Sequence, residues 1–208
     1  MAIVVVGGHT RSVGKTSAVA ELIAALPELR WSAMKITQYG HGVCSADGAP
    51  CHCATEDHTW ALSEEKDRSG ESDTSRFLVA GAGPVWWVRV QQGKLAEAMP
   101  AIRRRIEQSE NIIIESNSLL NFVRPSLYLT VLNPRVEDFK DSAQTFLDRA
   151  DAILLHETTE GETAQWKRIS LDFARRGRKV FRVAPPVYVS GKLIEFVREE
   201  IGSQGEKK

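Results

Sequence analysis

The chain has 208 residues, which is enough for one sizeable domain with a hydrophobic core. Hydrophobic residues make up 42% of it and charged residues 26%, values that are ordinary for a globular protein and argue against disorder. Lys and Arg total 27, and so do Asp and Glu, so no net charge attracts nucleic acid or an acidic membrane surface. We therefore expect neither nucleic acid nor a membrane as a partner.

The sequence gives no sign of membrane insertion or export. No apolar run approaches the roughly 20 residues that span a bilayer. The apolar stretch 2–6 is too short for a signal peptide, lacks a basic leader and continues directly into glycines. These features predict a cytoplasmic protein.

Strands and helices are predicted to alternate along the chain. Residues 3–6 form a β-branched run typical of a strand buried on both faces, and a helix is predicted over Lys15–Ala25 and ended by Pro27. Further strands are predicted at 31–36, 85–90, 111–115, 126–132, 152–156 and 179–183. Further helices are predicted at 73–82 with Asp73 as N-cap, 95–108, 141–150, 161–176 and 190–201, followed by a frayed tail at 202–208.

This alternation predicts an α/β fold, a mostly parallel sheet with helices on both faces, formed by the whole chain 1–208 as a single domain. Between 37 and 72 the regularity stops, and glycine, cysteine, histidine and acidic residues replace it. We interpret this segment as a long insertion after the second strand, and long ordered loops are usually functional. Functional loops of such sheets follow the carboxyl ends of strands, so the insertion is expected on the same edge as the loop after residue 6.

A glycine-rich loop joins the first strand to the first helix. Backbone N–H groups around Gly14 can point at a phosphate, and the helix N-terminus adds partial positive charge. Lys15 would neutralise the β- and γ-phosphates, and the Thr16 hydroxyl would ligate Mg²⁺. The strand before the loop and the helix after it favour a P-loop NTPase site. Its predicted nucleotide-binding residues are Gly8, His9, Thr10, Arg11, Ser12, Val13, Gly14, Lys15, Thr16 and Ser17.

Two resemblances follow from these residues. The loop, with five residues between Gly8 and Gly14, resembles the phosphate loop of dethiobiotin synthetases. Residues 1–135 are similar to the molybdopterin-guanine dinucleotide biosynthesis adaptor family (MobB), which implies a P-loop NTPase fold. The chain departs from that family in its three cysteines and in having Glu-Ser-Asn where the family has Glu-Gly-Phe. The matching features are a Lys that ends the second strand, an Asp before an Ala-Gly-Ala segment and a Glu that ends a later strand, namely Lys35, Asp73 and Glu115.

Phosphoryl transfer needs a metal and groups that hold it opposite Thr16. Glu115, at the carboxyl tip of an apolar strand, can bind Mg²⁺ directly or through water, or else be a solvated strand end. Asp73 is a second carboxylate for the metal, as the resemblance implies, or only a helix cap, and Asp67 competes with it for that role. Lys35 can reach a γ-phosphate or an anionic substrate, or be an ordinary surface lysine. The predicted catalytic residues are Lys15, Glu115 and Lys35, and the predicted Mg²⁺ ligands are Thr16, Glu115 and Asp73.

The sequence leaves the nucleobase open between adenine and guanine. Guanine-specific proteins of this superfamily usually carry Asn-Lys-x-Asp after a late strand. The corresponding stretch, 152–159, lacks the Asp that would accept hydrogen bonds from guanine. ATP is therefore slightly favoured over GTP.

The predicted insertion carries six potential metal ligands within 18 residues. Thiolate and imidazole suit zinc, which is usually held by four ligands in a tetrahedron. An iron–sulfur cluster is less favoured because four cysteines are its usual ligands, and a flexible loop with reactive thiols is the alternative to any metal. The preferred set for a zinc-like ion is Cys44, Cys51 and Cys53 with His58 or His41.

Two kinds of function remain open. One is an enzyme that uses ATP or GTP for Mg²⁺-dependent hydrolysis or phosphoryl transfer in cofactor biosynthesis. The other is a nucleotide-binding adaptor or metallochaperone that holds a metal in the Cys/His loop. Either would engage an unidentified small-molecule or protein partner besides the nucleotide, and a homodimer is also left open.

Overall fold

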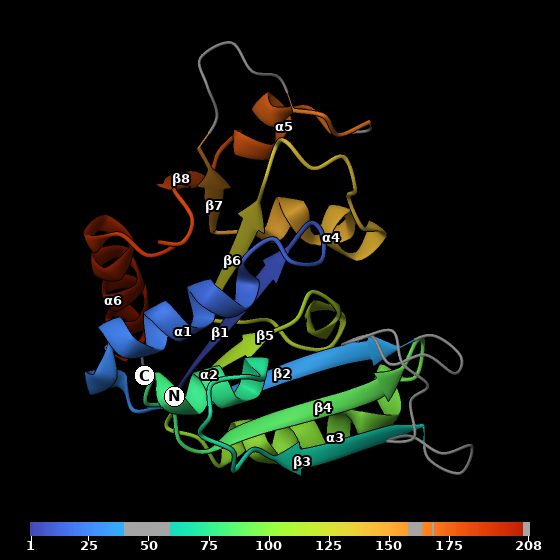
Figure 1. Cartoon of the computed structure of the whole chain (residues 1–208), viewed down its shortest axis with the longest axis vertical. Coiled ribbons are helices and arrows are strands. Elements are labelled where there is room, and N and C mark those ends of the chain that lie inside the picture. Colours follow the sequence, from blue (N-terminus) through green and yellow to red (C-terminus); the bar gives the residue numbers. More distant parts are fainter. Residues whose placement is uncertain (40–58, 158–163, 168, 206–208) are drawn as a thin grey trace.

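A computed structural model describes residues 1–39, 59–157, 164–167 and 169–205. Within these residues the strands form one eight-stranded sheet in the order β3-β4-β2-β5-β1-β6-β7-β8 (Figure 1). They are β1 (Ala2–Gly8), β2 (Trp31–Tyr39), β3 (Trp60–Glu64), β4 (Val85–Gln91), β5 (Asn111–Glu115), β6 (Leu127–Leu132), β7 (Ala152–His156) and β8 (Lys179–Val183). Neighbouring strands run parallel except for the antiparallel pair β3 and β4. The predicted mostly parallel sheet is confirmed.

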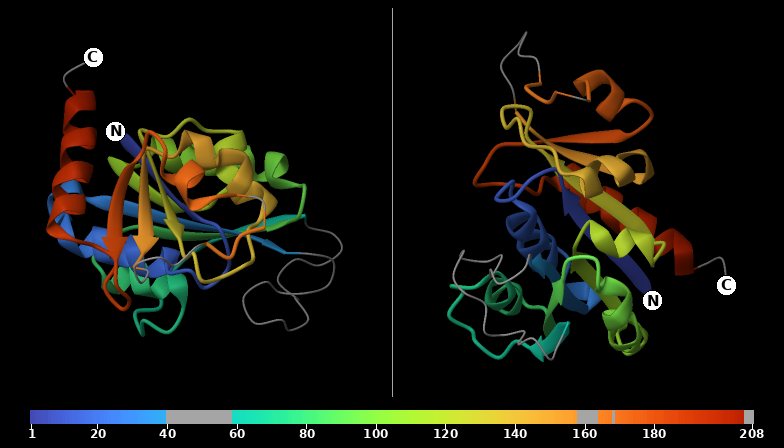
Figure 2. Two further views of the ribbon diagram at one scale, coloured as in Figure 1. Left: turned by 90° about the horizontal axis from the view of Figure 1, so that it is seen from above. Right: turned by 90° about the vertical axis from the view of Figure 1, so that its right-hand side faces the viewer.

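Helices cover both faces of the sheet, as predicted (Figure 2). One face packs against α1 (Lys15–Ala25), α2 (Asp73–Val79) and α6 (Gly191–Gly205). The other packs against α3 (Leu95–Glu107), α4 (Asp141–Phe146) and α5 (Leu171–Arg175). The 3-10 turns η1 (Pro27–Leu29), η2 (Ser118–Asn121) and η3 (Leu147–Arg149) connect these elements. Among the described residues, none of the helices combines the length and apolarity that a bilayer crossing requires.

The central strand β1 positions the candidate site. Side chains alternate across a strand, so Val4 and Val6 lie in the core beneath α1, whereas Val5 lies in the core beneath α3. Glu115, the last residue of β5, is paired with Val6 of β1 on one side and with Lys35 of β2 on the other. Three central strands therefore place Val6, Glu115 and Lys35 side by side, although β2 continues four residues beyond Lys35 to Tyr39.

The predicted insertion 37–72 is too long. The second strand continues to Tyr39, and β3 lies inside the segment, antiparallel to β4. Trp60 and Leu62 of β3 alternate onto the face that packs against the core beneath α3. This short edge strand has the alternating pattern of a half-buried strand, which the polar residues around it concealed. Residues 40–58 lie outside the described part of the chain.

Several helix ends differ from the prediction. Ser72, not Asp73, caps α2, because the Ser72 side chain accepts a hydrogen bond from the Ser75 amide at 3.1 Å. The helix expected over 161–176 begins only at Leu171, where Ser170 supplies the cap. The helix expected over 141–150 ends at Phe146 and passes into η3. The tail expected to fray from residue 202 continues as helix to Gly205, the last residue of α6.

Candidate functional site

The loop between β1 and α1 needs glycine at its last position. Gly14 has φ 99°, a left-handed conformation that side chains with a Cβ rarely adopt. A Cβ on Gly14 would also overlap the ring of Tyr188, which lies directly against the loop. A Cβ on Gly8 would lie 2.7 Å from Val13 Cγ1, so the two ends of the loop approach closely. The glycines thus allow a compact turn that leads into the N-terminus of α1.

Lys15 folds back over this turn. Its Nζ donates a hydrogen bond to the Thr10 carbonyl at 2.7 Å. Burial lowers the pKa of Lys15 to about 8, although the Glu115 carboxylate acts to raise it. The first turn of α1 contains no acidic residue that would oppose an anion. Lys15 and the free N–H groups of this turn therefore form an anion-binding arrangement.

A charged cluster closes the loop on the side of β2 and β5. The Lys35 Nζ donates to Asp73 Oδ2, to Glu115 Oε1 at 3.1 Å and to Thr16 Oγ1 at 3.5 Å. The Thr16 hydroxyl in turn donates to Glu115 Oε2 at 2.8 Å. Burial lowers the pKa of Lys35, but the Glu115 and Asp73 carboxylates outweigh it and the pKa is raised. Lys35 is thus a firmly protonated cation inside a cluster of oxygens.

The oxygens around Lys35 are the ones that the sequence predicts as Mg²⁺ ligands. Thr16, Asp73 and Glu115 come from three separate elements and converge on one cation. Hydroxyl and carboxylate oxygens are the donors that Mg²⁺ prefers, so this set fits the metal. The competing carboxylate, Asp67, is exposed and bonds to the Ser69 amide at 2.9 Å and to its hydroxyl at 2.6 Å. The structure therefore brings Asp73, and not Asp67, to the charged cluster.

His9 attaches the loop to the segment after β6. Its Nδ1 donates to the Asp138 carbonyl at 2.7 Å, and its Nε2 accepts from the Asn133 amide at 3.0 Å. These partners require the neutral ring, and burial lowers the pKa of His9 to about 4. Phe139 and Trp166 pack beside the ring with centroids 5.2 and 5.5 Å away. The His9 side chain, predicted among the nucleotide-binding residues, thus points away from the phosphate side and supports the loop.

The other predicted loop residues fall into two groups. Thr10 is buried and donates its hydroxyl to Asp138 Oδ2, which strengthens the attachment on the β6 side. Arg11 and Ser12 are exposed at the outer surface of the loop. Lys140, which sequence reasoning missed, donates its amide to the His9 carbonyl at 2.8 Å. Burial lowers the pKa of the half-buried Lys140, and the charge of Arg11 lowers it further, so the β6 side also brings a cation to the loop.

A cavity of about 280 Å³ opens beside the loop, at the ends of β6, β7 and β8. His156 connects it to the phosphate loop through a hydrogen bond of 2.9 Å between its Nε2 and the Val13 carbonyl. Glu157 also lines the cavity, so a carboxylate is present there although the Asp of the guanine motif is missing. The residues that line this cavity are Asn133, Arg135, His156, Glu157, Val183, Ala184 and Pro185.

The chain after β8 returns to the phosphate loop, which the sequence did not predict. The Tyr188 and Val189 amides both donate to Glu21 Oε2 of α1 at 2.8 Å. The Tyr188 ring then lies between Gly14 and His156, with 5.6 Å between the ring centroids of Tyr188 and His156. The sequence signal for this contact is Glu21, the one polar residue of α1 after its polar first turn.

The predicted zinc-like site cannot be located in the same way. Its ligands His41, Cys44, Cys51, Cys53 and His58 all lie outside the described residues. Within 1–39, 59–157, 164–167 and 169–205, no three His, Cys, Asp or Glu side chains converge as a metal site. The Mg²⁺ set above is of a different kind, with two carboxylates and one hydroxyl.

No protein-family model matches the chain, and no curated protein matches it. Solved structures with an overlapping fold include the following three. LpxK from Aquifex aeolicus in complex with ATP is 17% identical over 88% of this chain, with a TM-score of 0.47, and the chain spans about half, 53%, of the LpxK chain. HypB from Helicobacter pylori in complex with nickel is 13% identical over 97% of this chain and 86% of its own, with a TM-score of 0.48. The MinC:MinD cell division protein complex of Aquifex aeolicus is 12% identical over 96% of this chain and 86% of its own, with a TM-score of 0.44.

Because all three TM-scores are below 0.5, we assign no residue of the site from these structures. The site is defined by the residues of this chain alone. The glycine loop lies at the carboxyl end of the buried parallel strand β1. It leads into α1, which begins with Lys15 and Thr16. A strand-end carboxylate, Glu115, bonds to the threonine of the loop. This combination defines a P-loop-like α/β fold.

Proposed function

We propose that the chain binds a nucleoside triphosphate with Mg²⁺ on residues 8–17 and hydrolyses it or transfers its terminal phosphoryl group. The observation that supports this most is the hydrogen bond between Thr16 and Glu115, which joins the phosphate loop to a strand-end carboxylate. A structural turn would not need a buried carboxylate there. A metal-dependent phosphate site does need one.

Lys15 and the N–H groups at the start of α1 would bind the β- and γ-phosphates. Lys15 is already held over the loop by the Thr10 carbonyl, a contact that a phosphate oxygen would replace with a charged one. Partial burial strengthens the attraction between this ammonium and an anion, because less water screens it. Binding and orienting the phosphate chain would be the principal work of these groups.

Thr16, Glu115 and Asp73 would hold Mg²⁺. Mg²⁺ held there would supply positive charge against the charge that develops on the phosphate oxygens. Lys35 would have to give up part of its contacts with the same oxygens when the metal binds. Its ammonium would then be available to an oxygen of the γ-phosphate or of an anionic second substrate, as expected from the sequence.

The nucleobase would enter the cavity beside His156. Either adenine or guanine is compatible with this proposal. The sequence favours ATP because the guanine-binding Asp is missing, but Glu157 supplies a carboxylate at the cavity that could accept hydrogen bonds from guanine. Binding measurements with both nucleotides would decide between them.

Two finer roles rest on the sequence alone. One is cofactor biosynthesis, through the resemblance to the MobB family. The other is the adaptor or metallochaperone alternative, in which the Cys/His loop holds about one zinc-like ion per chain. Elemental analysis of protein prepared without chelator or oxidant would test the metal-binding alternative. If no metal is found, the remaining interpretation is a flexible loop with reactive thiols. Retention of metal after Cys51 and Cys53 are both replaced by Ser would contradict the chosen ligands.

Phosphate release from ATP and from GTP, with and without Mg²⁺, tests the proposed reaction. Glu115→Gln should keep nucleotide affinity within about tenfold, or about 1.4 kcal/mol, and severely cut Mg²⁺-dependent turnover. Asp67→Asn is a matched control, because its carboxylate lies outside the cluster and turnover should not change. Wild-type turnover in Glu115→Gln would overturn the assignment of this carboxylate.

A further inference from the structure

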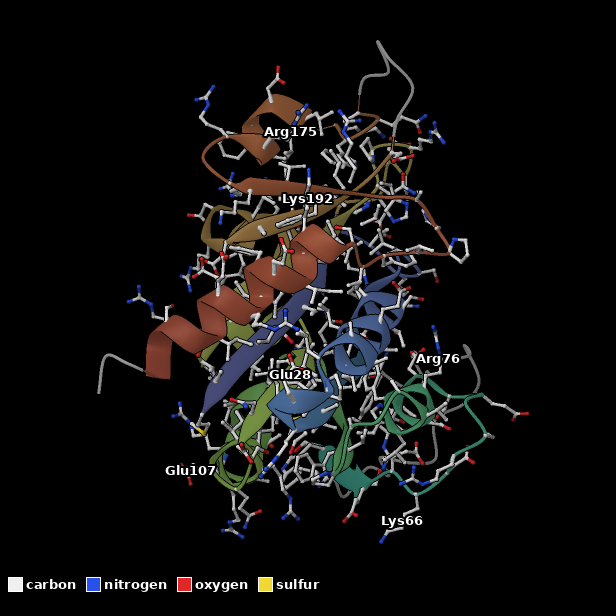
Figure 3. The ribbon with its side chains drawn as sticks, turned by 90° about the vertical axis from the view of Figure 1, so that its left-hand side faces the viewer. Glu28, Lys66, Arg76, Glu107, Arg175 and Lys192 are labelled. Atoms are coloured by element: carbon white, nitrogen blue, oxygen red, sulfur yellow. The ribbon has the colours of Figure 1, made fainter. Side chains whose placement is uncertain are left out.

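Arg76 of α2 brings a cation to α1 from outside the phosphate-loop motif. Its Nη2 donates to the Ser17 hydroxyl at 3.0 Å, across a sequence separation of 59 residues. Ser17 is the third residue of α1, after Lys15 and Thr16, so it lies in the turn whose N–H groups are free. Figure 3 shows Arg76 on α2, next to α1.

The position of Arg76 is fixed by the packing of α2. Phe77, the next residue, is fully buried in the core that α2 shares with α1. Ser72 caps the helix, and Asp73 ties its first turn to Lys35. The guanidinium is thus held over the start of α1 by a short helix with three independent attachments.

Within the described part of the chain, Arg76 has no carboxylate partner within ion-pair distance. Its recorded partner is the neutral Ser17 hydroxyl. A guanidinium has five N–H donors in a planar fork, and a single hydroxyl uses one of them. The remaining donors suit an anion with two oxygens, such as a phosphate.

Tyr188 shows on which side of the loop this charge acts. Ser17, which accepts from Arg76, and Glu21, which accepts from the Tyr188 amide at 2.8 Å, are four residues apart and therefore lie on the same face of α1. Tyr188 lies against Gly14, and its ring faces His156, which lines the cavity beside the loop. Arg76 therefore lies on the side of α1 that Tyr188 borders, whereas Asp73, one turn earlier in α2, lies on the side of Lys35.

We infer that Arg76 binds the α-phosphate of the nucleotide, the phosphate nearest the nucleoside. This assignment rests on the proposed function, in which Lys15 takes the terminal phosphates and Thr16 the metal. The α-phosphate carries the same charge before and after the terminal phosphoryl group leaves. Arg76 thus binds the ground state and the transition state equally, which lowers KM without changing kcat.

Calorimetric titration with nucleoside triphosphate and diphosphate, combined with steady-state kinetics, tests this role. Arg76→Ala should weaken the binding of both nucleotides by a similar factor of about ten, or about 1.4 kcal/mol. It should also raise KM while kcat stays unchanged. Arg76→Lys should recover part of the affinity, since it restores the charge without the fork. Arg68→Ala removes an exposed charge from the segment before α2 and should change nothing. If Arg76→Ala proves unstable, Arg76→Gln provides the same measurement.

Three results would overturn the assignment. Unchanged affinity for both nucleotides in Arg76→Ala would show that the guanidinium only packs α2 on α1. A fall in kcat at constant KM, or a loss confined to the triphosphate, would place Arg76 at the terminal phosphate. Failure of the wild-type chain to bind either nucleotide would instead remove the proposed function itself, and the Arg76 assignment with it.

Discussion

On the side of the phosphate loop that faces β2 and β5, the contacts are charged, with the Lys35 ammonium among oxygens of Thr16, Asp73 and Glu115. On the side that faces β6, the main contact is neutral. There the buried His9 ring joins two backbone groups and packs against two aromatic rings. Both sides connect the loop to the sheet, but only the charged side consists of groups that also bind Mg²⁺ and phosphate.

This difference indicates how the loop can respond to a ligand and still keep its shape. The cluster around Lys35 contains exchangeable contacts, because a metal ion or a phosphate can replace the ammonium or the carboxylates as a partner. The contacts of His9 are with backbone N–H and C=O groups, which no anion or cation would displace. We therefore expect ligands to change the stability of the charged side, and pH to change that of the neutral side.

Removing the cation from the charged side should give the largest effect on stability. Lys35→Met leaves Glu115, which is almost fully buried, facing Asp73 without a positive charge. We expect a loss of about 3 kcal/mol, at the low end for a broken buried pair because Asp73 is half-exposed. Millimolar Mg²⁺ should restore part of it. Urea unfolding with and without Mg²⁺ measures both quantities.

Lys66→Met is the matched control for this variant. Lys66 pairs with Glu64 at 3.7 Å, and both side chains are exposed, so its removal should cost under about 0.5 kcal/mol with no response to Mg²⁺. A wild-type stability for Lys35→Met would mean that the charged cluster does not hold the loop.

Acid should weaken the neutral side. The pKa of His9 is about 4 in the folded chain and 6.5 in the unfolded chain, so the native state binds fewer protons between these values. The contribution of His9 is therefore complete above pH 6.5 and declines as the pH falls towards 4, by up to about 3 kcal/mol. Lys15 and His156 face the ring and lower its pKa further, while Asp138 raises it.

The comparison of wild type with His9→Gln isolates this titration from that of the carboxylates. The glutamine amide can donate and accept as the neutral ring does, but it does not titrate. Urea unfolding from pH 7 to pH 4.5 should show a steeper loss for wild type than for His9→Gln. Parallel profiles would mean that His9 is not held neutral by its two backbone partners.

The smallest expected effect is at the cap of α2. Ser72→Ala removes the side chain that accepts from the Ser75 amide and should cost about 1 kcal/mol of stability. Ser170→Ala removes the equivalent cap of α5, a helix that carries none of the predicted Mg²⁺ ligands, at a similar cost. Only Ser72→Ala should also weaken Mg²⁺-nucleotide binding, because α2 carries Asp73. Equal binding by the two variants would contradict the role of α2 in positioning that carboxylate.

The sequence predicts the parts of the site that are contiguous or end a regular strand. The loop 8–17 has a fixed spacing, and Glu115 ends an apolar strand, so its position follows from parallel topology. Lys35 does not end the second strand as predicted, because β2 continues to Tyr39, but it lies beside Glu115 through strand pairing. The fold class follows from the same alternation. These features depend on local patterns, which a sequence displays directly.

The remaining features depend on contacts between distant residues. The return of Tyr188 to Gly14 joins positions 174 residues apart in the sequence numbering, and no periodicity predicts it. The direction of the His9 ring is set by backbone groups of Asn133 and Asp138, and no sequence motif marks these two positions. Ser72 caps α2, whereas the Asp73 side chain is bound to Lys35. Asp73 and Lys35 are 38 positions apart, so no local pattern shows the contact.

Residues 8–17 are proposed to bind the phosphates of a nucleotide. Calorimetric titration of Mg²⁺-ATP and Mg²⁺-GTP into the wild-type chain and into Lys15→Ala tests this proposal most directly, with Lys94→Ala as an exposed control. We expect saturable binding of at least one nucleotide to wild type and to the control. Lys15→Ala should lose at least about 100-fold in affinity, or about 2.7 kcal/mol, without a change in its unfolding midpoint. Equal affinity in wild type and Lys15→Ala would contradict the assignment of this loop as the nucleotide site.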